Sequence, residues 1–191
     1  EKSGYAHFML KEIFEQPRAI HESLLGRLSK PDLVALAPLL KVSTIKLIAC
    51  GTSYHAGLVG RYLFESLLRI PTSVELASEY RYSGPTADRP LIILITQSGE
   101  TADTLAAARE ARRRGSATVA VTNVLGSTIT REVDFVLYTR AGLEIGVAAT
   151  KSFTTQLVAL YLLSIGFGLQ WNLINDSTAD EMIKSLRKLP R

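Results

Sequence analysis

Cysteine is nearly absent from this sequence, and histidine is rare. The 191 residues include one cysteine and three histidines. The single Cys50 excludes a disulfide within the chain and any metal site built from several cysteines, which favours a reducing compartment and predicts a cytoplasmic protein. His7 and His21 have no acidic or cysteine partner at ligand spacing, so no metal site is expected. No cofactor is predicted.

Long charged runs are also scarce. The net charge is +4, but basic residues are spread along the chain and only Arg112–Arg114 cluster, at the end of a predicted helix where cations suit the helix dipole. We therefore expect no nucleic-acid partner. Residues 1–17 lack a basic segment followed by an apolar core, so no secretory signal is expected, and this beginning is typical of a cut made inside a longer protein.

The apolar runs are too short to predict a membrane span. Ser152–Asn175 contains no charged residue, yet its strongly apolar part, Leu157–Leu169, has about 13 residues where a span needs roughly 20. The pattern favours a buried core helix and no membrane partner.

After about residue 40, short apolar runs alternate with longer amphipathic stretches. The runs predict strands at Ile45–Cys50, Ser73–Leu76, Leu91–Thr96, Ala117–Thr122 and Phe135–Tyr138. Helices are predicted at about Ser53–Leu68, Thr101–Arg114 and Val147–Gly168. Strands buried on both faces that alternate with helices predict an α/β fold, doubly wound around a parallel five-stranded sheet and flanked by helices.

The first 40 residues predict an N-terminal helical extension in three parts. "HFMLKEIFEQ" is followed by "PRAIHESLLGRL", in which Pro17 takes a permitted first-turn position, and by "KPDLVALAPLL". The α/β domain is predicted to cover residues 41–180, with Ser83–Pro90 as a loop inside it.

Small polar residues gather where the strand Leu91–Ile95 ends. The sequence "TQSGETADT" offers hydrogen-bonding side chains and a glycine just before a helix whose first-turn N–H groups are free. In a parallel sheet such an end is where ligands bind. We interpret the junction as a phosphate site made of neutral donors, at Thr96, Gln97, Ser98 and Thr101.

Two observations weigh against this interpretation. Glu100 would repel a phosphate unless its side chain points elsewhere, towards the helix dipole or a sugar hydroxyl. Ser98 or Thr101 could also do no more than cap the helix, although one cap does not explain four such side chains.

A second polar junction, "CGTSYHAG", follows the strand Ile45–Cys50. Thr52 and Ser53 stand at its helix start, but the spacing is neither a dinucleotide fingerprint nor a P-loop. Next to the first junction, it predicts polar contacts to the rest of a phosphorylated ligand. His55 is more often solvated than catalytic in such a place, and Glu144 and Lys151 could face the site or form a surface pair.

Longer motifs carry a family resemblance. "HFMLKEIFEQP", "ACGTSYHAG", "TQSGETADTLAAAREA" and "AGLEIGVAATKSFTTQ" resemble the glutamine:fructose-6-phosphate aminotransferase (isomerising) family, also called glucosamine-6-phosphate synthases, from about Tyr5 to Phe167. The resemblance implies the flavodoxin-like SIS sugar-isomerase fold.

The family enzyme consists of a glutaminase domain and two SIS subdomains. The resemblance implies that this chain is the linker end, residues 1–40, the first SIS subdomain, and, in residues 181–191, the start of a connection to the second. It implies no catalytic residue in this chain, because the family carries its catalytic glutamate, lysine and histidine in the second subdomain and the tail.

The resemblance also implies an activity and ligand contacts. The family converts fructose 6-phosphate and glutamine-derived ammonia into glucosamine 6-phosphate, in amino-sugar biosynthesis, as a homodimer. Thr96, Gln97, Ser98 and Thr101 would bind the sugar phosphate. Thr52 and Ser53 would reach the sugar hydroxyls, and the Val147 backbone would line the sugar pocket.

Two positions depart from the family pattern. Thr96 stands where the family usually has serine, which keeps a hydroxyl but adds a methyl, and Ala149 removes a hydroxyl that the family often has.

A rival hypothesis is a non-catalytic SIS module that senses sugar phosphates, although no convincing helix-turn-helix precedes the domain. A Rossmann nucleotide enzyme is disfavoured by the missing glycine fingerprint.

Overall fold

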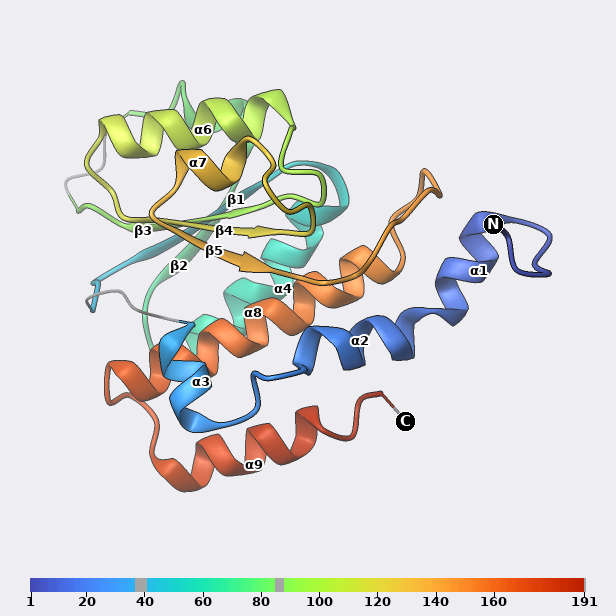
Figure 1. The fold of residues 1–191 in the computed structure, drawn as a ribbon. Coiled ribbons are helices and arrows are strands. Elements are labelled where there is room, and N and C mark those ends of the chain that lie inside the picture. Colours follow the sequence, from blue (N-terminus) through green and yellow to red (C-terminus); the bar gives the residue numbers. More distant parts are fainter. Residues whose placement is uncertain (37–40, 85–87, 191) are drawn as a thin grey trace.

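A parallel sheet forms the centre of this computed structural model, which describes residues 1–36, 41–84 and 88–190. Within those residues the strands are β1 (Ile45–Ala49), β2 (Thr72–Leu76), β3 (Leu91–Ile95), β4 (Thr118–Thr122) and β5 (Phe135–Tyr138). Their order is β2-β1-β3-β4-β5, and every neighbouring pair is parallel (Figure 1). The predicted doubly wound five-stranded sheet is confirmed.

The strand sequences explain the position of the sheet in the core. Every residue of β3 and β4 is buried, as expected for a strand covered by helices on both faces. Alternate side chains supply the two cores. Leu47 and Ile93 belong to the cluster with Phe64 and Leu163, whereas Ile92 and Leu94 belong to the cluster with alanines of the opposite helix layer.

Helices cover both faces of the sheet (Figure 1). The helices α4 (Gly51–Leu68) and α8 (Lys151–Gln170) pack together on one face. On the other lie α6 (Ala102–Arg113) and α7 (Ile129–Glu132), and α5 (Ala77–Tyr80) packs into the same core cluster as they do. Helix α8 is long and apolar enough to cross a membrane, yet 72% of its most apolar window is buried inside the molecule, which confirms the predicted core helix.

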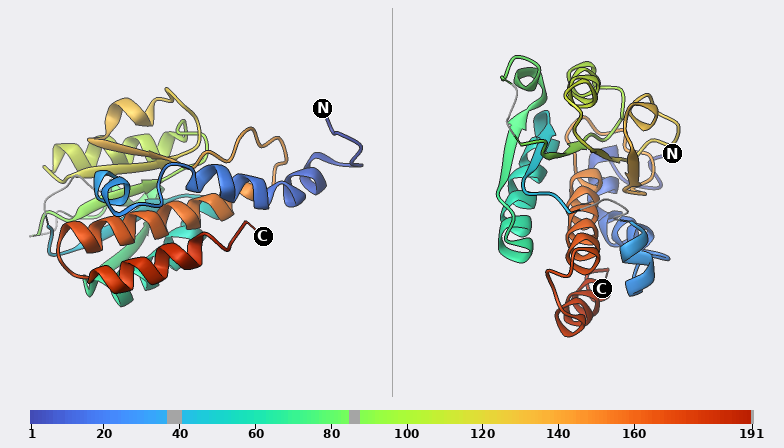
Figure 2. Two further views of the ribbon diagram at one scale, coloured as in Figure 1. Left: turned by 60° about the horizontal axis from the view of Figure 1, so that its bottom comes forward. Right: turned by 90° about the vertical axis from the view of Figure 1, so that its left-hand side faces the viewer.

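The N-terminal extension consists of α1 (Phe8–Phe14), α2 (Gln16–Leu24) and α3 (Lys30–Ala35). Pro17 stands in the first turn of α2, as predicted. Together with the C-terminal α9 (Asp176–Leu186), α2 and α3 cover the outer side of α8 (Figure 2). The part of the predicted third helix at 37–40, and residues 85–87 of the predicted loop, lie outside the described residues.

One sequence prediction needs correction, and one helix was missed. The last long helix begins at Lys151, not at Val147, because the Glu144 carboxylate accepts hydrogen bonds from the backbone N–H groups of Thr150 and Ser152 and so caps the helix there. Helix α9 was not predicted, although Asn175 caps it by accepting from the Thr178 N–H at 2.8 Å. The proposed boundary between residues 180 and 181 falls within α9.

Candidate functional site

The two polar junctions lie side by side at the carboxyl edge of the sheet. Strands β1 and β3 pair in parallel, with Ala49 opposite Ile95, so the segments that follow them emerge next to each other. In the order β2-β1-β3-β4-β5 this is also the topological switch point, because β2 lies on one side of β1 whereas β3 to β5 lie on the other, and open α/β sheets bind ligands at such a point.

A pocket of about 230 Å³ opens at this edge. All seven residues predicted to contact ligand line it, namely Thr52, Ser53, Thr96, Gln97, Ser98, Thr101 and Val147. Further lining residues include Thr104, Glu144, Gly146, Ala149 and Ser152. Among these described lining residues there is no lysine or arginine, so the donors that face the pocket are neutral.

The β3–α6 turn is organised by its own side chains. The Gly99 N–H donates to Thr96 Oγ1 at 3.2 Å, and the Glu100 N–H donates to Ser98 Oγ at 3.2 Å. Thr101 is the N-cap residue of α6, but its side chain makes no capping hydrogen bond. Capping therefore does not account for the Thr101 hydroxyl, and the first-turn N–H groups of α6 lack intrahelical acceptors.

Gly99 is the residue on which this turn depends. Its φ is +70°, and a Cβ there would lie 2.1 Å from Ser127 Oγ. The turn therefore needs both the backbone freedom and the small size of glycine.

Glu100 does not face the pocket. Its Oε1 accepts the Thr128 backbone N–H at 2.7 Å, and this hydrogen bond lowers the pKa of the carboxyl group. The carboxylate is thus directed to the segment before α7, away from the pocket, which weakens the repulsion that it would exert on a phosphate.

Helix α8 reaches the first junction through a buried amide. Gln156 Nε2 donates to Ser53 Oγ at 2.9 Å, so one lone pair of the Ser53 hydroxyl is engaged and its proton can be donated into the pocket. Thr52 is exposed at the pocket mouth.

The sequence analysis missed two pocket hydroxyls. Thr104 is 1% exposed and Ser152 is 2% exposed, and both line the pocket. In the described part of the chain, Thr104 Oγ1 and Ser152 Oγ are two of the three buried side-chain oxygens that lack a hydrogen-bond partner. Buried hydroxyls usually have partners, so these two indicate a place for a polar ligand or water. The i,i+3 spacing of Thr101 and Thr104 was the available signal.

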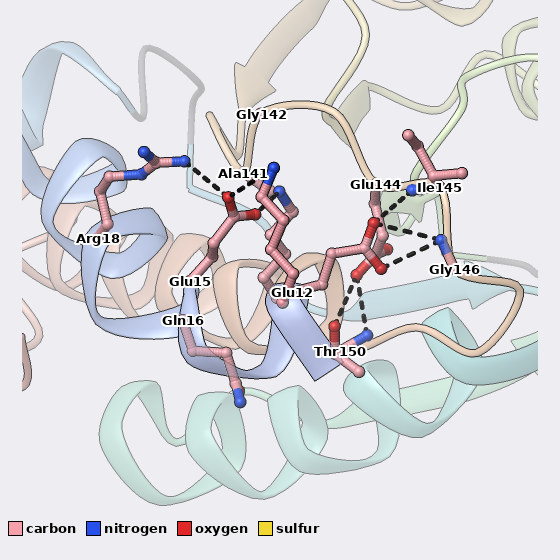
Figure 3. A network of polar contacts seen from close by, with 12 residues as sticks. Glu12, Glu15, Gln16, Arg18, Ala141, Gly142, Glu144, Ile145, Gly146 and Thr150 are labelled. Atoms are coloured by element: carbon pink, nitrogen blue, oxygen red, sulfur yellow. Dashed lines mark hydrogen bonds and ion pairs between the residues drawn. The ribbon is translucent and has the colours of Figure 1, made fainter. Parts of the chain in front are cut away.

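The segment between β5 and α8 forms the remaining wall, and we call residues 142–150 the site loop. Glu144 lines the pocket while accepting from the Thr150 N–H at 2.9 Å and from Thr150 Oγ1 at 3.1 Å (Figure 3). Lys151 does not form a surface ion pair with Glu144. Lys151 is buried and lies 2.7 Å from Glu15 Oε2, and this hydrogen bond lowers the pKa of Glu15.

The other candidates lie elsewhere. His7, His21 and His55 are exposed, and none lines the pocket. The basic end of α6 is only partly solvated, since Arg114 is largely buried and donates to the Tyr80 and Ser83 carbonyls.

The SIS domain family model matches residues 39–166, which include both junctions, the pocket and most of α8. The chain belongs to the SIS domain family. This SIS domain is similar to glutamine:fructose-6-phosphate aminotransferases (isomerizing), with 53% identity to the protein of Symbiobacterium thermophilum and 51% to that of Caldanaerobacter subterraneus. Each alignment covers 100% of this chain and 33% of the relative, so the chain spans about a third of their length.

The SIS domain also resembles a solved structure closely. It superimposes on the C-terminal domain of glucosamine-fructose-6-phosphate aminotransferase from Francisella tularensis with a TM-score of 0.90 and 39% identity. That match covers 100% of this chain and 55% of the other.

Proposed function

We propose that this chain is the sugar-phosphate-binding half of the isomerase site of a glucosamine-6-phosphate synthase, and that it binds fructose 6-phosphate and glucosamine 6-phosphate. The single observation that carries the proposal is one pocket, at the switch point of the sheet, lined by neutral hydroxyl and amide donors. The similarity to the aminotransferases supports the choice of ligand.

The phosphate lies in the β3–α6 turn. The hydroxyls of Thr96, Ser98 and Thr101 and the amide of Gln97 surround it, together with the first N–H groups of α6. A helix N-terminus and neutral donors bind a dianion without lysine or arginine.

The sugar extends from the phosphate towards β1 and the site loop. Ser53, oriented by Gln156, and Thr52 reach its hydroxyls, and the Val147 backbone lines the opposite wall. Thr104 and Ser152 offer two further hydroxyls in the same pocket. Ala149 supplies none.

In the full enzyme, ammonia from glutamine attacks the C2 carbonyl of open-chain fructose 6-phosphate, the C2 oxygen leaves as water, and a proton then moves from C1 to C2. This chain fixes the end of the substrate remote from that chemistry, and such binding energy orients the reacting carbons. We assign no proton transfer to its residues, so the isolated chain binds without turnover. The full enzyme works as a cytoplasmic homodimer, which the resemblance to its family supports.

Calorimetric titration of the purified chain with glucosamine 6-phosphate, glucosamine and inorganic phosphate tests the proposal. Saturable binding of glucosamine 6-phosphate, at least about tenfold tighter than that of glucosamine, is the expected result because the phosphate contacts are charge-assisted. Equal affinity for the two sugars would contradict a phosphate site.

A further inference from the structure

The site loop lacks apolar packing of its own. Leu143, Ile145 and Val147 are all exposed, and Val147 is fully so. Burial of side chains, the usual means of fixing a segment, therefore does not fix this one. The loop nevertheless forms a wall of the pocket through Glu144, Gly146, Val147 and Ala149.

Helix α1 supplies a polar contact in place of that packing. Glu12 Oε1 accepts the Ile145 N–H at 2.6 Å, and Glu12 Oε2 accepts the Gly146 N–H at 3.1 Å (Figure 3). A Cβ on residue 146 would lie 2.5 Å from Glu12 Oε2, so the carboxylate can keep this position only opposite glycine. The contact joins two parts of the chain that lie 134 residues apart in sequence.

Glu12 is only 2% exposed, and a buried carboxylate is costly unless hydrogen bonds compensate it. In the part of the chain that the structure describes, no cation lies within ion-pair distance of Glu12. The hydrogen bonds from the Ile145 and Gly146 N–H groups therefore offset the cost of burying the Glu12 carboxylate. The carboxylate and the loop thus hold each other in place.

The residues at the junction of α1 and α2 contact the start of α8. Glu15 Oε2 lies 2.7 Å from Lys151 Nζ, and Thr154 Oγ1 donates to Gln16 Oε1 at 2.5 Å (Figure 3 shows Glu15 and Gln16). Lys151 precedes Ser152, which lines the pocket. The N-terminal extension thus contacts both ends of the segment that carries Val147.

We propose that Glu12 is a positioning residue for the ligand site. It holds the Ile145 and Gly146 N–H groups so that the adjoining Val147 backbone stands at the pocket wall. Without this contact the loop samples other positions. The apparent affinity then falls in proportion to the fraction of molecules in which the loop is still in place. This inference rests on the proposed function for its ligand but not for the contact itself.

The test compares Glu12→Gln with Glu22→Gln, an isosteric control at an exposed glutamate of α2. In Glu12→Gln an amide NH2 group replaces one of the two carboxylate oxygens. Because NH2 is a donor, it cannot accept the N–H group of Ile145 or Gly146 that this oxygen accepted. Amide hydrogen exchange is measured first, without ligand. We expect exchange at Ile145 and Gly146 to accelerate about tenfold or more, while that of buried Ile93 is unchanged, and we expect no change in the control.

The second measurement is the affinity for glucosamine 6-phosphate, at a temperature where circular dichroism shows both variants folded. We expect Glu12→Gln to lose about tenfold in affinity, as for a charge-assisted hydrogen bond, and the control to match the wild type. Unchanged exchange at Ile145 and Gly146, or unchanged affinity, overturns the proposal. Failure of the wild type to bind would instead contradict the proposed function, while the exchange data still decide whether Glu12 holds the loop.

Discussion

The Glu100 carboxylate accepts the backbone N–H of Thr128 at 2.7 Å and so points away from the pocket whose edge it adjoins. This resolves the main objection to a phosphate in the β3–α6 turn. The carboxylate of Glu100, next to the proposed phosphate site in sequence, is engaged with another segment, and the hydrogen bond from Thr128 lowers its pKa.

Substitution of Glu100 by glutamine should therefore separate stability from binding. We expect the affinity for glucosamine 6-phosphate to stay within about twofold, because removal of a charge that does not face the ligand changes little. The melting temperature should fall, since the contact with Thr128 weakens. Titration and thermal unfolding of the same preparation check this, and a large gain in affinity would show that the carboxylate repels the ligand.

Gly99→Ala should disrupt the same turn. A methyl group at a φ of +70° and 2.1 Å from Ser127 Oγ forces the turn to move, so we expect the free energy of unfolding to fall by at least about 2 kcal/mol. Gly126→Ala is the control, because Gly126 has a φ of +69° but a Cβ there would meet no atom of the described residues within 4 Å. Urea unfolding of both variants measures the difference, and equal losses would refute the steric argument.

The ion pairs of Glu110 should make stability depend on pH. Arg113 and Arg114 lower the pKa of Glu110 from 4.5 to about 2, with nitrogen–oxygen distances of 2.7 and 2.6 Å. A carboxyl group whose pKa is lowered by folding stabilises the protein above its unfolded pKa. That stabilisation is lost as the pH falls from about 4.5 towards 2.

Glu110→Gln should consequently destabilise the protein at pH 6 and much less at pH 3. Urea unfolding at both values measures the change, with Glu181→Gln, at an exposed position of α9, as control. If the wild type and Glu110→Gln differ equally at the two pH values, the ionised carboxylate is not the source of the stabilisation.

The sheet and the place of the site were predictable from local patterns. Apolar β-branched runs such as "LIILI" leave little alternative to a buried strand, and the rule that ligands bind beyond strand ends directs attention to Thr96–Thr101. The start of α8 was not predictable, because the cap at Thr150 comes from Glu144 outside the helix.

Long-range polar contacts were equally hidden. The contact of Glu12 with Gly146, and of Glu15 with Lys151, joins residues more than 130 positions apart, and no local periodicity marks such pairs. A buried hydroxyl without a hydrogen-bond partner, such as that of Ser152, can be identified only when the packing around it is known. Local chemistry thus predicted residues that line one pocket, and tertiary structure was needed to show what positions them.

The most direct test of the central claim is the affinity of the Ser98→Ala, Thr101→Ala double variant for glucosamine 6-phosphate and for glucosamine. If these hydroxyls bind the phosphate, the variant loses at least about tenfold in affinity for glucosamine 6-phosphate and little for glucosamine. A folded double variant that binds glucosamine 6-phosphate as the wild type does would contradict the claim that the β3–α6 turn is a phosphate site.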